Sequence, residues 1–205
     1  MSLTVIYIHG FNSSAQSLKA QQLSAYYNEH QLSLSGYELL IPSIDFSPKL
    51  AIDALSQLIE QYSDSPVLLI GSSLGGYYSI YLAQKYENCV AVLINPAVYP
   101  YLLLAQMLGE QQNLYTGEKY QLTTEHITQL QALDVAQIKD PKRLLLLSQK
   151  GDETLDYGEA VAKLAGVEQR VSEAGNHSYE NFSAVIPQLF EFAEQHFLLG
   201  SIVNE

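Results

Sequence analysis

The sequence predicts an α/β protein in which a compact, six-stranded, mainly parallel sheet carries helices on both faces. Short apolar runs alternate with longer segments in which apolar residues recur every three or four positions. Several runs, such as residues 144–147, are hydrophobic throughout, as expected when both faces of a parallel sheet are covered. With 205 residues, 47% of them hydrophobic, the chain can form one sizeable core, so we expect a single domain over residues 1–205.

Each apolar run corresponds to an expected strand, and each periodic segment to an expected helix. The strands are expected at residues 4–8, 38–41, 67–70, 90–94, 143–148 and 168–172. The helices are expected at residues 17–29, 48–62, 74–86, 156–164 and 181–197. With the strands numbered in chain order, we expect the spatial order 2-1-3-4-5-6. That order creates a switch point between the first and third strands, where open parallel sheets build their sites.

The alternation is interrupted after the fourth strand. Residues 95–142 show no good strand pattern, but helical patterns cover residues 99–108 and 124–133, with a turn-like segment at residues 115–120 between them. We therefore expect a small helical insertion at residues 95–142. Two interpretations stay open: the insertion is a cap over the substrate, or it consists of packing helices with no role in substrate choice.

The overall charge and the N-terminal residues exclude several function classes. The chain has 22 acidic and 10 basic residues, a formal net charge of −12, which leaves few cations to neutralise nucleic-acid phosphates or an anionic membrane. No run of 18 apolar residues occurs, and the chain opens on a strand-like segment without a basic leader. We expect a soluble, cytoplasmic protein. The single cysteine, Cys89, is expected to be buried and allows no disulfide within one chain.

The most informative motif is Gly71-Ser72-Ser73-Leu74-Gly75, a G-x-S-x-G pattern between an apolar strand and a helical segment. A serine in such a sharp turn is held in strained backbone dihedrals with its hydroxyl exposed, and flanking glycines leave room for the turn. The helix N-terminus that follows can stabilise an anion. Ser73 is therefore the candidate nucleophile.

A serine nucleophile needs a base, and His177 is the candidate. It follows the last expected strand in the loop Gly175-Asn176-His177, ahead of the C-terminal helix. The chain order is then serine, acid, histidine, as in α/β enzymes with this serine motif. Three other histidines fit better as surface or packing residues: His30, His126 and His196.

The acid that orients the base is less sharply defined, because three carboxylates follow the fifth strand. Asp152 is favoured because it comes first after the strand and its glycine. Asp156 is explained as a helix N-cap, with Glu159 three residues further on. Glu153 is expected to be a solvent-facing loop charge.

Two backbone N–H groups are candidates for an oxyanion hole. Leu74 directly follows the nucleophile, and Phe11 lies in the loop after the first strand, where Gly10 permits a close turn. His9 is expected to shape this loop through hydrogen bonds. The sequence contains no H-x-x-x-H, H-E-x-x-H or G-x-G-x-x-G pattern, and the serine motif lacks the lysine of a P-loop, so we expect no metal and no cofactor.

Taken together, these segments resemble the α/β-hydrolase superfamily, and more closely the YqiA-like small bacterial esterases. The resemblance rests on residues 9–14, 71–78, 95–98, 115–117, 151–157 and 175–177. It implies a compact hydrolase that lacks the first two strands of larger members. It also implies activity on short acyl esters, small-molecule substrates, through a triad of Ser73, Asp152 and His177.

We therefore expect a serine esterase that forms an acyl-enzyme intermediate. An acyl thioesterase with the same triad is an alternative, because it differs mainly in the pocket for the leaving group. A second alternative is a catalytically silent protein that keeps the fold and binds a small ligand in the cleft. The intact triad argues against this second alternative, because a silent member has no need of a strained serine.

Overall fold

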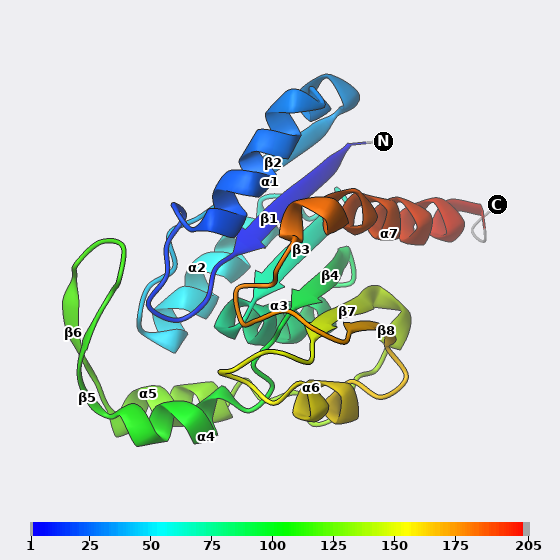
Figure 1. Ribbon diagram of the computed structural model, residues 1–205. Helices are drawn as coiled ribbons and strands as arrows, with labels where there is room; N and C mark the ends of the chain where they lie inside the picture. Colours follow the sequence, from blue (N-terminus) through cyan, green and yellow to red (C-terminus); the bar gives the residue numbers. More distant parts are fainter. Residues whose placement is uncertain (1, 203–205) are drawn as a thin grey trace.

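A computed structural model describes residues 2–202, with side chains described through residue 198. The six expected strands form one sheet of order β2-β1-β3-β4-β7-β8, in which all neighbouring strands are parallel (Figure 1). Their bounds are Leu3–Ile8 (β1), Tyr37–Leu40 (β2), Val67–Ser72 (β3), Cys89–Ile94 (β4), Leu144–Gln149 (β7) and Glu168–Ser172 (β8). The expected order of the six strands is confirmed.

Helices cover both faces of this sheet (Figure 1). They are α1 (Leu18–Glu29) and α7 (Phe182–Ile202) on one face, and α2 (Pro48–Glu60), α3 (Leu74–Lys85) and α6 (Tyr157–Lys163) on the other. Successive side chains of a strand point to opposite faces, so β1 contributes to two cores. Val5 and Tyr7 pack toward α1 and α7, whereas Ile6 and Ile8 pack toward α2 and α3.

The registers of the central strands bring the site loops together. Ile8, the last residue of β1, lies opposite Gly71 of β3, so the loops after these strands begin side by side. Ser72 of β3 in turn lies opposite Ile94, the last residue of β4. The same edge of the sheet therefore carries the loops that follow β1, β3, β4, β7 and β8.

The insertion after β4 differs from the expectation. The expected helices are present as α4 (Pro100–Leu104), continued by a 3₁₀ turn over Ala105–Met107, and α5 (Thr124–Gln131), but an antiparallel hairpin lies between them. Its strands, β5 (Gly109–Gln112) and β6 (Lys119–Leu122), stand apart from the main sheet (Figure 1). The expectation of no strand was wrong because each strand has four residues, and β5 is Gly-Glu-Gln-Gln, with no apolar side chain to reveal a period.

Two further expectations concern burial and membranes. Cys89 is buried, as expected, and burial raises the pKa of its thiol to about 12. None of the helices in residues 2–202 is long and apolar enough to cross a membrane.

Candidate active site

The turn between β3 and α3 is strained at Ser73. Its φ of 55° and ψ of −120° are rare for a residue with a side chain. The backbone is held on both sides, since the Ser73 N–H donates to the Ile94 carbonyl at 3.1 Å and its carbonyl accepts from the Gly76 N–H at 2.9 Å. A Cβ on Gly75 would lie 2.0 Å from the Ile8 carbonyl oxygen, so glycine is required there. The sharp turn expected from the motif is present.

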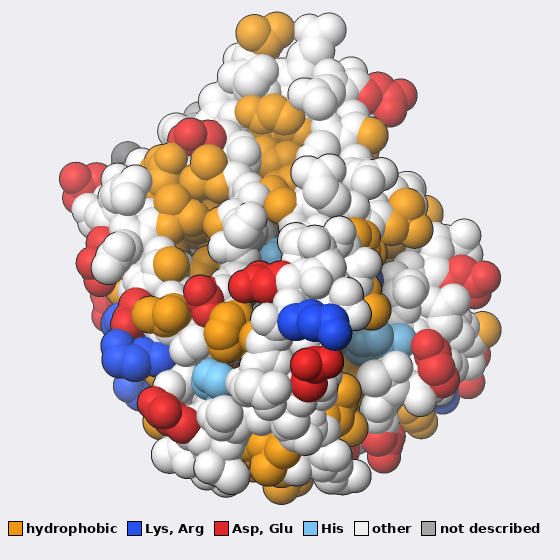
Figure 2. Space-filling view, turned by 90° about the vertical axis from the view of Figure 1, so that its left-hand side faces the viewer, with side chains coloured by type: hydrophobic (Ala, Val, Ile, Leu, Met, Phe, Trp, Pro, Cys, Tyr) orange, Lys and Arg blue, Asp and Glu red, His pale blue; other side chains and the backbone are white. Residues whose placement is uncertain are grey.

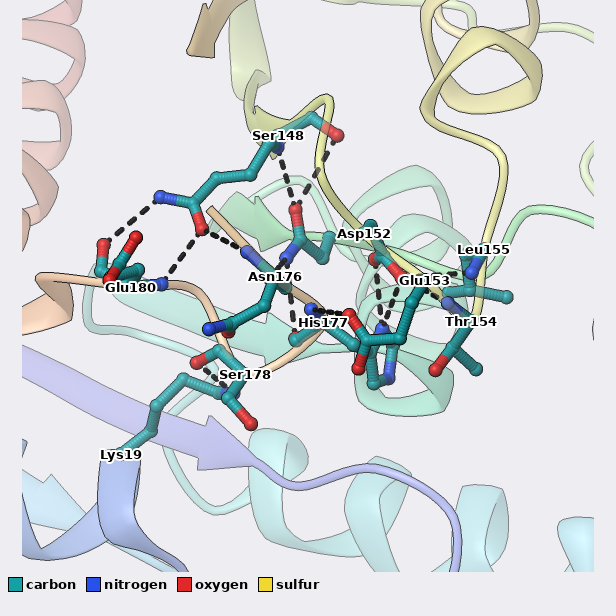
Figure 3. A network of polar contacts seen from close by, with 12 residues as sticks. Lys19, Ser148, Asp152, Glu153, Thr154, Leu155, Asn176, His177, Ser178 and Glu180 are labelled. Carbon is teal, nitrogen blue, oxygen red and sulfur yellow. Dashed lines mark hydrogen bonds and ion pairs between the residues drawn. The ribbon is translucent and has the colours of Figure 1, made fainter. Parts of the chain in front are cut away.

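His177 and Asp152 are in direct contact. His177 Nδ1 lies 2.8 Å from Asp152 Oδ2 and 3.0 Å from Oδ1 (Figure 3). An ionised carboxylate only accepts hydrogen bonds, so Nδ1 carries the proton and Nε2 is free to accept another. The Asp152 side chain is 2% exposed and that of His177 is 26% exposed. The imidazole therefore borders open space while its acid partner is buried behind it.

Hydrogen bonds keep Asp152 ionised. Burial alone raises the pKa of this carboxyl, but the hydrogen bond with His177 and two backbone N–H groups together hold it below its usual range. These N–H groups belong to Leu155 and Thr154, and each donates to Asp152 Oδ1 at 2.8 Å. A buried carboxylate in this state can stabilise a positively charged imidazole.

The other two carboxylates of this loop have different partners. Asp156 caps α6, accepting the Gly158 N–H at 2.8 Å, as expected. Glu153 is exposed but is not a free loop charge, because its Oε2 accepts the backbone N–H of His177 at 3.0 Å (Figure 3). Asp152 is the carboxylate that contacts the imidazole, and Glu153 holds the backbone of the same histidine.

Asn95 ties the histidine loop to the centre of the sheet. It follows β4 with a φ of 39° and is buried. Its Nδ2 donates to the carbonyls of Asn176 at 2.9 Å and His177 at 3.3 Å, while its Oδ1 accepts the Gln149 N–H at 2.9 Å. Sequence reasoning assigned no role to this side chain; an asparagine directly after a central strand was the available signal.

Gln149, the last residue of β7, holds the same loop from another side. Its Oε1 accepts the backbone N–H groups of Asn176 at 3.1 Å and Glu180 at 2.7 Å, and its Nε2 donates to the Glu180 carbonyl at 3.0 Å. Gly175 passes directly over this amide with a φ of 101°, and a Cβ there would lie 2.0 Å from Gln149 Oε1. The loop that carries His177 is therefore fixed by buried side chains of neighbouring strands.

Two unpaired backbone donors border Ser73. In the described part of the chain, the N–H groups of Phe11 and Leu74 have no hydrogen-bond partner, and both residues line a cavity with Ser73. A Cβ on Gly10 would lie 3.0 Å from Ser73 Cβ, which shows how closely the loop after β1 approaches the serine. Unpaired N–H groups in this arrangement can stabilise an oxyanion.

His9 shapes the loop after β1. Its Nδ1 lies 3.1 Å from the Gly10 carbonyl, and its Nε2 accepts the Ile44 N–H at 3.2 Å. Nε2 must be unprotonated to accept, so the buried ring is neutral. Burial lowers the pKa of His9, against the smaller opposing effect of the Gly10 carbonyl.

Two cavities meet at Ser73 and His177. One, of about 290 Å³, has a mostly apolar lining that includes Leu74, Leu103, Leu104 and Met107. The other, of about 260 Å³, has a mixed lining, in which hydroxyl-bearing side chains and Lys19 lie beside Phe11, Leu18 and Leu114. Ser73 and His177 both line these cavities, and no hydrogen bond joins their side chains within residues 2–198. No group of three or more metal-binding side chains is found in the same residues.

The parallel sheet of this strand order, the helices on both of its faces and the strained serine after β3 are the features of the α/β-hydrolase fold. Mouse α/β hydrolase domain-containing protein 10 superposes with a TM-score of 0.71 at 16% identity, over 94% of this chain and 90% of its own. Est1E from Butyrivibrio proteoclasticus, in a structure with ferulic acid bound, superposes with a TM-score of 0.67 at 15% identity, over 97% and 90%. The esterase domain of a Rhodothermus marinus protein superposes with a TM-score of 0.61 at 21% identity, over 95% and 86%.

The chain belongs to an uncharacterised protein family, UPF0227, which it matches over residues 4–194. A UPF0227 protein of Vibrio parahaemolyticus is 24% identical over 189 residues, covering 92% of this chain and 98% of that protein. The family match extends over β3, β4, β7, β8 and all but the first residue of β1, with the loops that follow these strands.

Proposed function

We propose that this protein is a serine esterase that hydrolyses short-chain acyl esters, with Ser73 as nucleophile, His177 as base and Asp152 as the acid that orients it. The observation that carries this proposal is the His177–Asp152 pair, in which His177 lines the same cavities as the strained Ser73. The resemblance to YqiA-like small bacterial esterases and the likeness in fold to esterases support the same chemistry.

The reaction follows from the positions of these groups. Ser73 Oγ attacks the ester carbonyl carbon while His177 Nε2 takes the hydroxyl proton, and the N–H groups of Phe11 and Leu74 hold the oxyanion. The C–O bond to the alcohol then breaks, and His177 returns the proton to the leaving oxygen. Water, activated by the same imidazole, hydrolyses the acyl-enzyme and releases the acid and Ser73.

The apolar cavity is suited to the acyl group. Leu103, Leu104 and Met107, which belong to α4 and the turn after it, line this cavity together with Ser73. The insertion is also tied to the oxyanion loop, because the Leu114 N–H donates to the Asn12 carbonyl at 3.2 Å. These contacts favour the interpretation of residues 95–142 as a cap that contributes to the acyl pocket.

The proposal is tested by hydrolysis of p-nitrophenyl esters from C2 to C10 and by labelling with a fluorophosphonate. We expect wild-type turnover with a preference for short chains, and a fall in kcat of at least about 10⁴-fold in Ser73→Ala and His177→Ala. Ser73→Ala should lose the label completely, because the phosphonate reacts only with the activated hydroxyl.

The matched control is Ser183→Ala, which removes an exposed serine hydroxyl from α7. It should keep wild-type activity and labelling. Turnover that survives in Ser73→Ala would refute the proposed nucleophile. Failure of the wild type both to hydrolyse esters and to take up the label would favour a silent binding protein, and hydrolysis of acyl-CoA alone would favour a thioesterase.

A further inference from the structure

The second cavity at Ser73 has a different lining from the apolar one. It lies between the loop after β1, the start of α1 and the histidine loop. Hydroxyl-bearing side chains make up much of the wall: Tyr7, Ser13, Ser17, Ser72, Tyr115 and Ser178. One cation, Lys19, is part of the same wall. The esterase mechanism proposed above uses none of these groups.

The N-terminus of α1 borders this cavity without a side-chain cap. Ser17 is the N-cap residue, yet its hydroxyl accepts no hydrogen bond from the first turn of the helix. Ser17 is 6% exposed, and its Oγ, which lies near the Tyr7 hydroxyl, makes no hydrogen bond of normal geometry in the described part of the chain. The first N–H groups of a helix have no intrahelical partner and favour an anion. An uncapped helix N-terminus thus borders the cavity that Lys19 also lines.

Lys19, in the first turn of α1, adds a positive charge. Its Nζ donates to the Ser178 carbonyl at 3.0 Å, beside His177 (Figure 3). No carboxylate in residues 2–198 lies within ion-pair distance of this ammonium. Burial lowers the pKa of Lys19 to about 8, with Asp152 acting in the opposite direction. The Asp152 carboxylate is already bonded to His177, and the partly buried Lys19 has no carboxylate partner within residues 2–198.

A cation in this position is unusual for the molecule. The chain carries a net charge of −12, and on the face drawn in Figure 2 acidic side chains are spread widely, with few basic ones among them. Neither Lys nor Arg lines the apolar cavity. The two cavities that meet at Ser73 therefore differ in both polarity and charge.

We propose that Lys19 and the N-terminus of α1 form a subsite for a carboxylate on the alcohol part of the ester, while the acyl group enters the apolar cavity. This inference rests on the proposed esterase function and names its substrate class: esters of a short apolar acid with an anionic alcohol or phenol. The carboxylate supplies the anionic partner that Lys19 lacks.

The test compares two esters that differ in charge but hardly in shape: 4-carboxyphenyl butyrate and 4-carbamoylphenyl butyrate. The quantity measured is the ratio of their kcat/KM values, charged over neutral, in the wild type and in Lys19→Met. Dividing one enzyme's ratio by the other's cancels the intrinsic reactivities of the esters. We expect Lys19→Met to lower the ratio about tenfold, as expected for loss of one charge-assisted hydrogen bond.

Two further variants separate this subsite from other effects of the lysine. Lys19→Arg keeps the charge and should keep most of the preference for the carboxylate. Lys49→Met removes a positive charge from α2, where Lys49 pairs with Asp53 and lines neither cavity, and should leave the ratio unchanged. An unchanged ratio in Lys19→Met would overturn the proposal. If kcat/KM fell equally for both esters, the lysine would only hold Ser178 in place.

A binding measurement separates this inference from the proposed function. Calorimetry with Ser73→Ala should give a Kd for 4-hydroxybenzoate about tenfold lower than with the Ser73→Ala/Lys19→Met double variant. For neutral 4-hydroxybenzamide the two Kd values should agree. If the wild type hydrolyses neither ester but this difference is present, the esterase proposal fails and the anion subsite stands. If the difference is absent, the subsite is refuted whether or not the esters are hydrolysed.

Discussion

At the residue scale, the two acids beside His177 differ in what they hold. Asp152 bonds the imidazole with a buried side chain, whereas Glu153 bonds the backbone N–H of the same residue and is exposed. Only Asp152 can set the tautomer of the ring and stabilise its charged form. Glu153 can act only by keeping the loop in place.

This difference predicts unequal effects of two conservative substitutions. Asp152→Asn replaces the carboxylate with an amide that can impose the wrong tautomer on His177, and kcat should fall by about 10⁴-fold. Glu153→Gln keeps an acceptor oxygen for the backbone N–H and should cost less than about tenfold. Steady-state kinetics on p-nitrophenyl butyrate measures both.

Asp156→Asn is the matched control, because asparagine serves equally well as an N-cap and the Asp156 side chain accepts a hydrogen bond from the start of α6. It should keep wild-type kcat. If Glu153→Gln lowered kcat as much as Asp152→Asn, the assignment of Asp152 as the acid would be contradicted.

At the scale of elements, neighbouring strands hold the loop that carries the base. Asn95, which follows β4, and Gln149, at the end of β7, hydrogen-bond the loop after β8. These hydrogen bonds hold the loop that carries His177 in a fixed position relative to the turn that carries Ser73.

Asn95→Ala should therefore lower both stability and activity. Its amide bonds three backbone groups, and leaving them unpaired in the interior costs about 1–3 kcal/mol of unfolding free energy. Because His177 then loses its fixed position, kcat/KM should fall about 100-fold. Urea unfolding and ester hydrolysis measure the two effects.

Asn88→Ala provides the comparison at the opposite end of β4. Asn88 Nδ2 also donates to two backbone carbonyls, those of Tyr62 at 3.0 Å and Ser65 at 2.8 Å, but far along the strand from Ser73. It should lose stability without losing kcat/KM. Equal losses of activity in the two variants would mean that general destabilisation, and not the position of the loop, explains the effect of Asn95→Ala.

At the scale of the whole molecule, the buried neutral His9 links folding to pH. The folded chain holds the pKa of His9 below its ordinary value, so the folded state binds this proton more weakly than the unfolded chain does. The stability that depends on neutral His9 is therefore fully present above about pH 6.5, the ordinary pKa of histidine. It is lost as the pH falls through the lowered pKa of the folded state.

Urea unfolding between pH 7.5 and pH 5 checks this coupling. The wild-type free energy of unfolding should decrease as the pH falls over about this range. His9→Gln, whose amide oxygen can accept the Ile44 N–H without titrating, should show a shallower decrease. A slope in the variant equal to that of the wild type would show that protons bound elsewhere, for example at His196, whose pKa burial also lowers, account for the pH dependence.

Some of this molecule could be predicted from local pattern alone. The six strands, their order and the turn at Ser73 follow from apolar periodicity, glycine spacing and the handedness of parallel crossovers, all of which act over short stretches of chain. The sequence also placed Ser73, Asp152 and His177 after strands that end at one edge of the sheet. The hairpin of β5 and β6 was not predicted because each strand has only four residues and β5 has no apolar side chain.

Only the tertiary structure decided which polar side chains meet. Asn95 and Asn176 are 81 residues apart in the chain, and Lys19 and Ser178 are 159 apart, yet each pair is hydrogen-bonded. No local pattern marks such contacts, because they depend on how separate strands and helices pack. The sequence by itself determined the strand order and the turn at Ser73, through local periodicity and chain handedness. The folded sheet decided what supports His177 and what charge faces Ser73, because those contacts exist only once distant segments have come together.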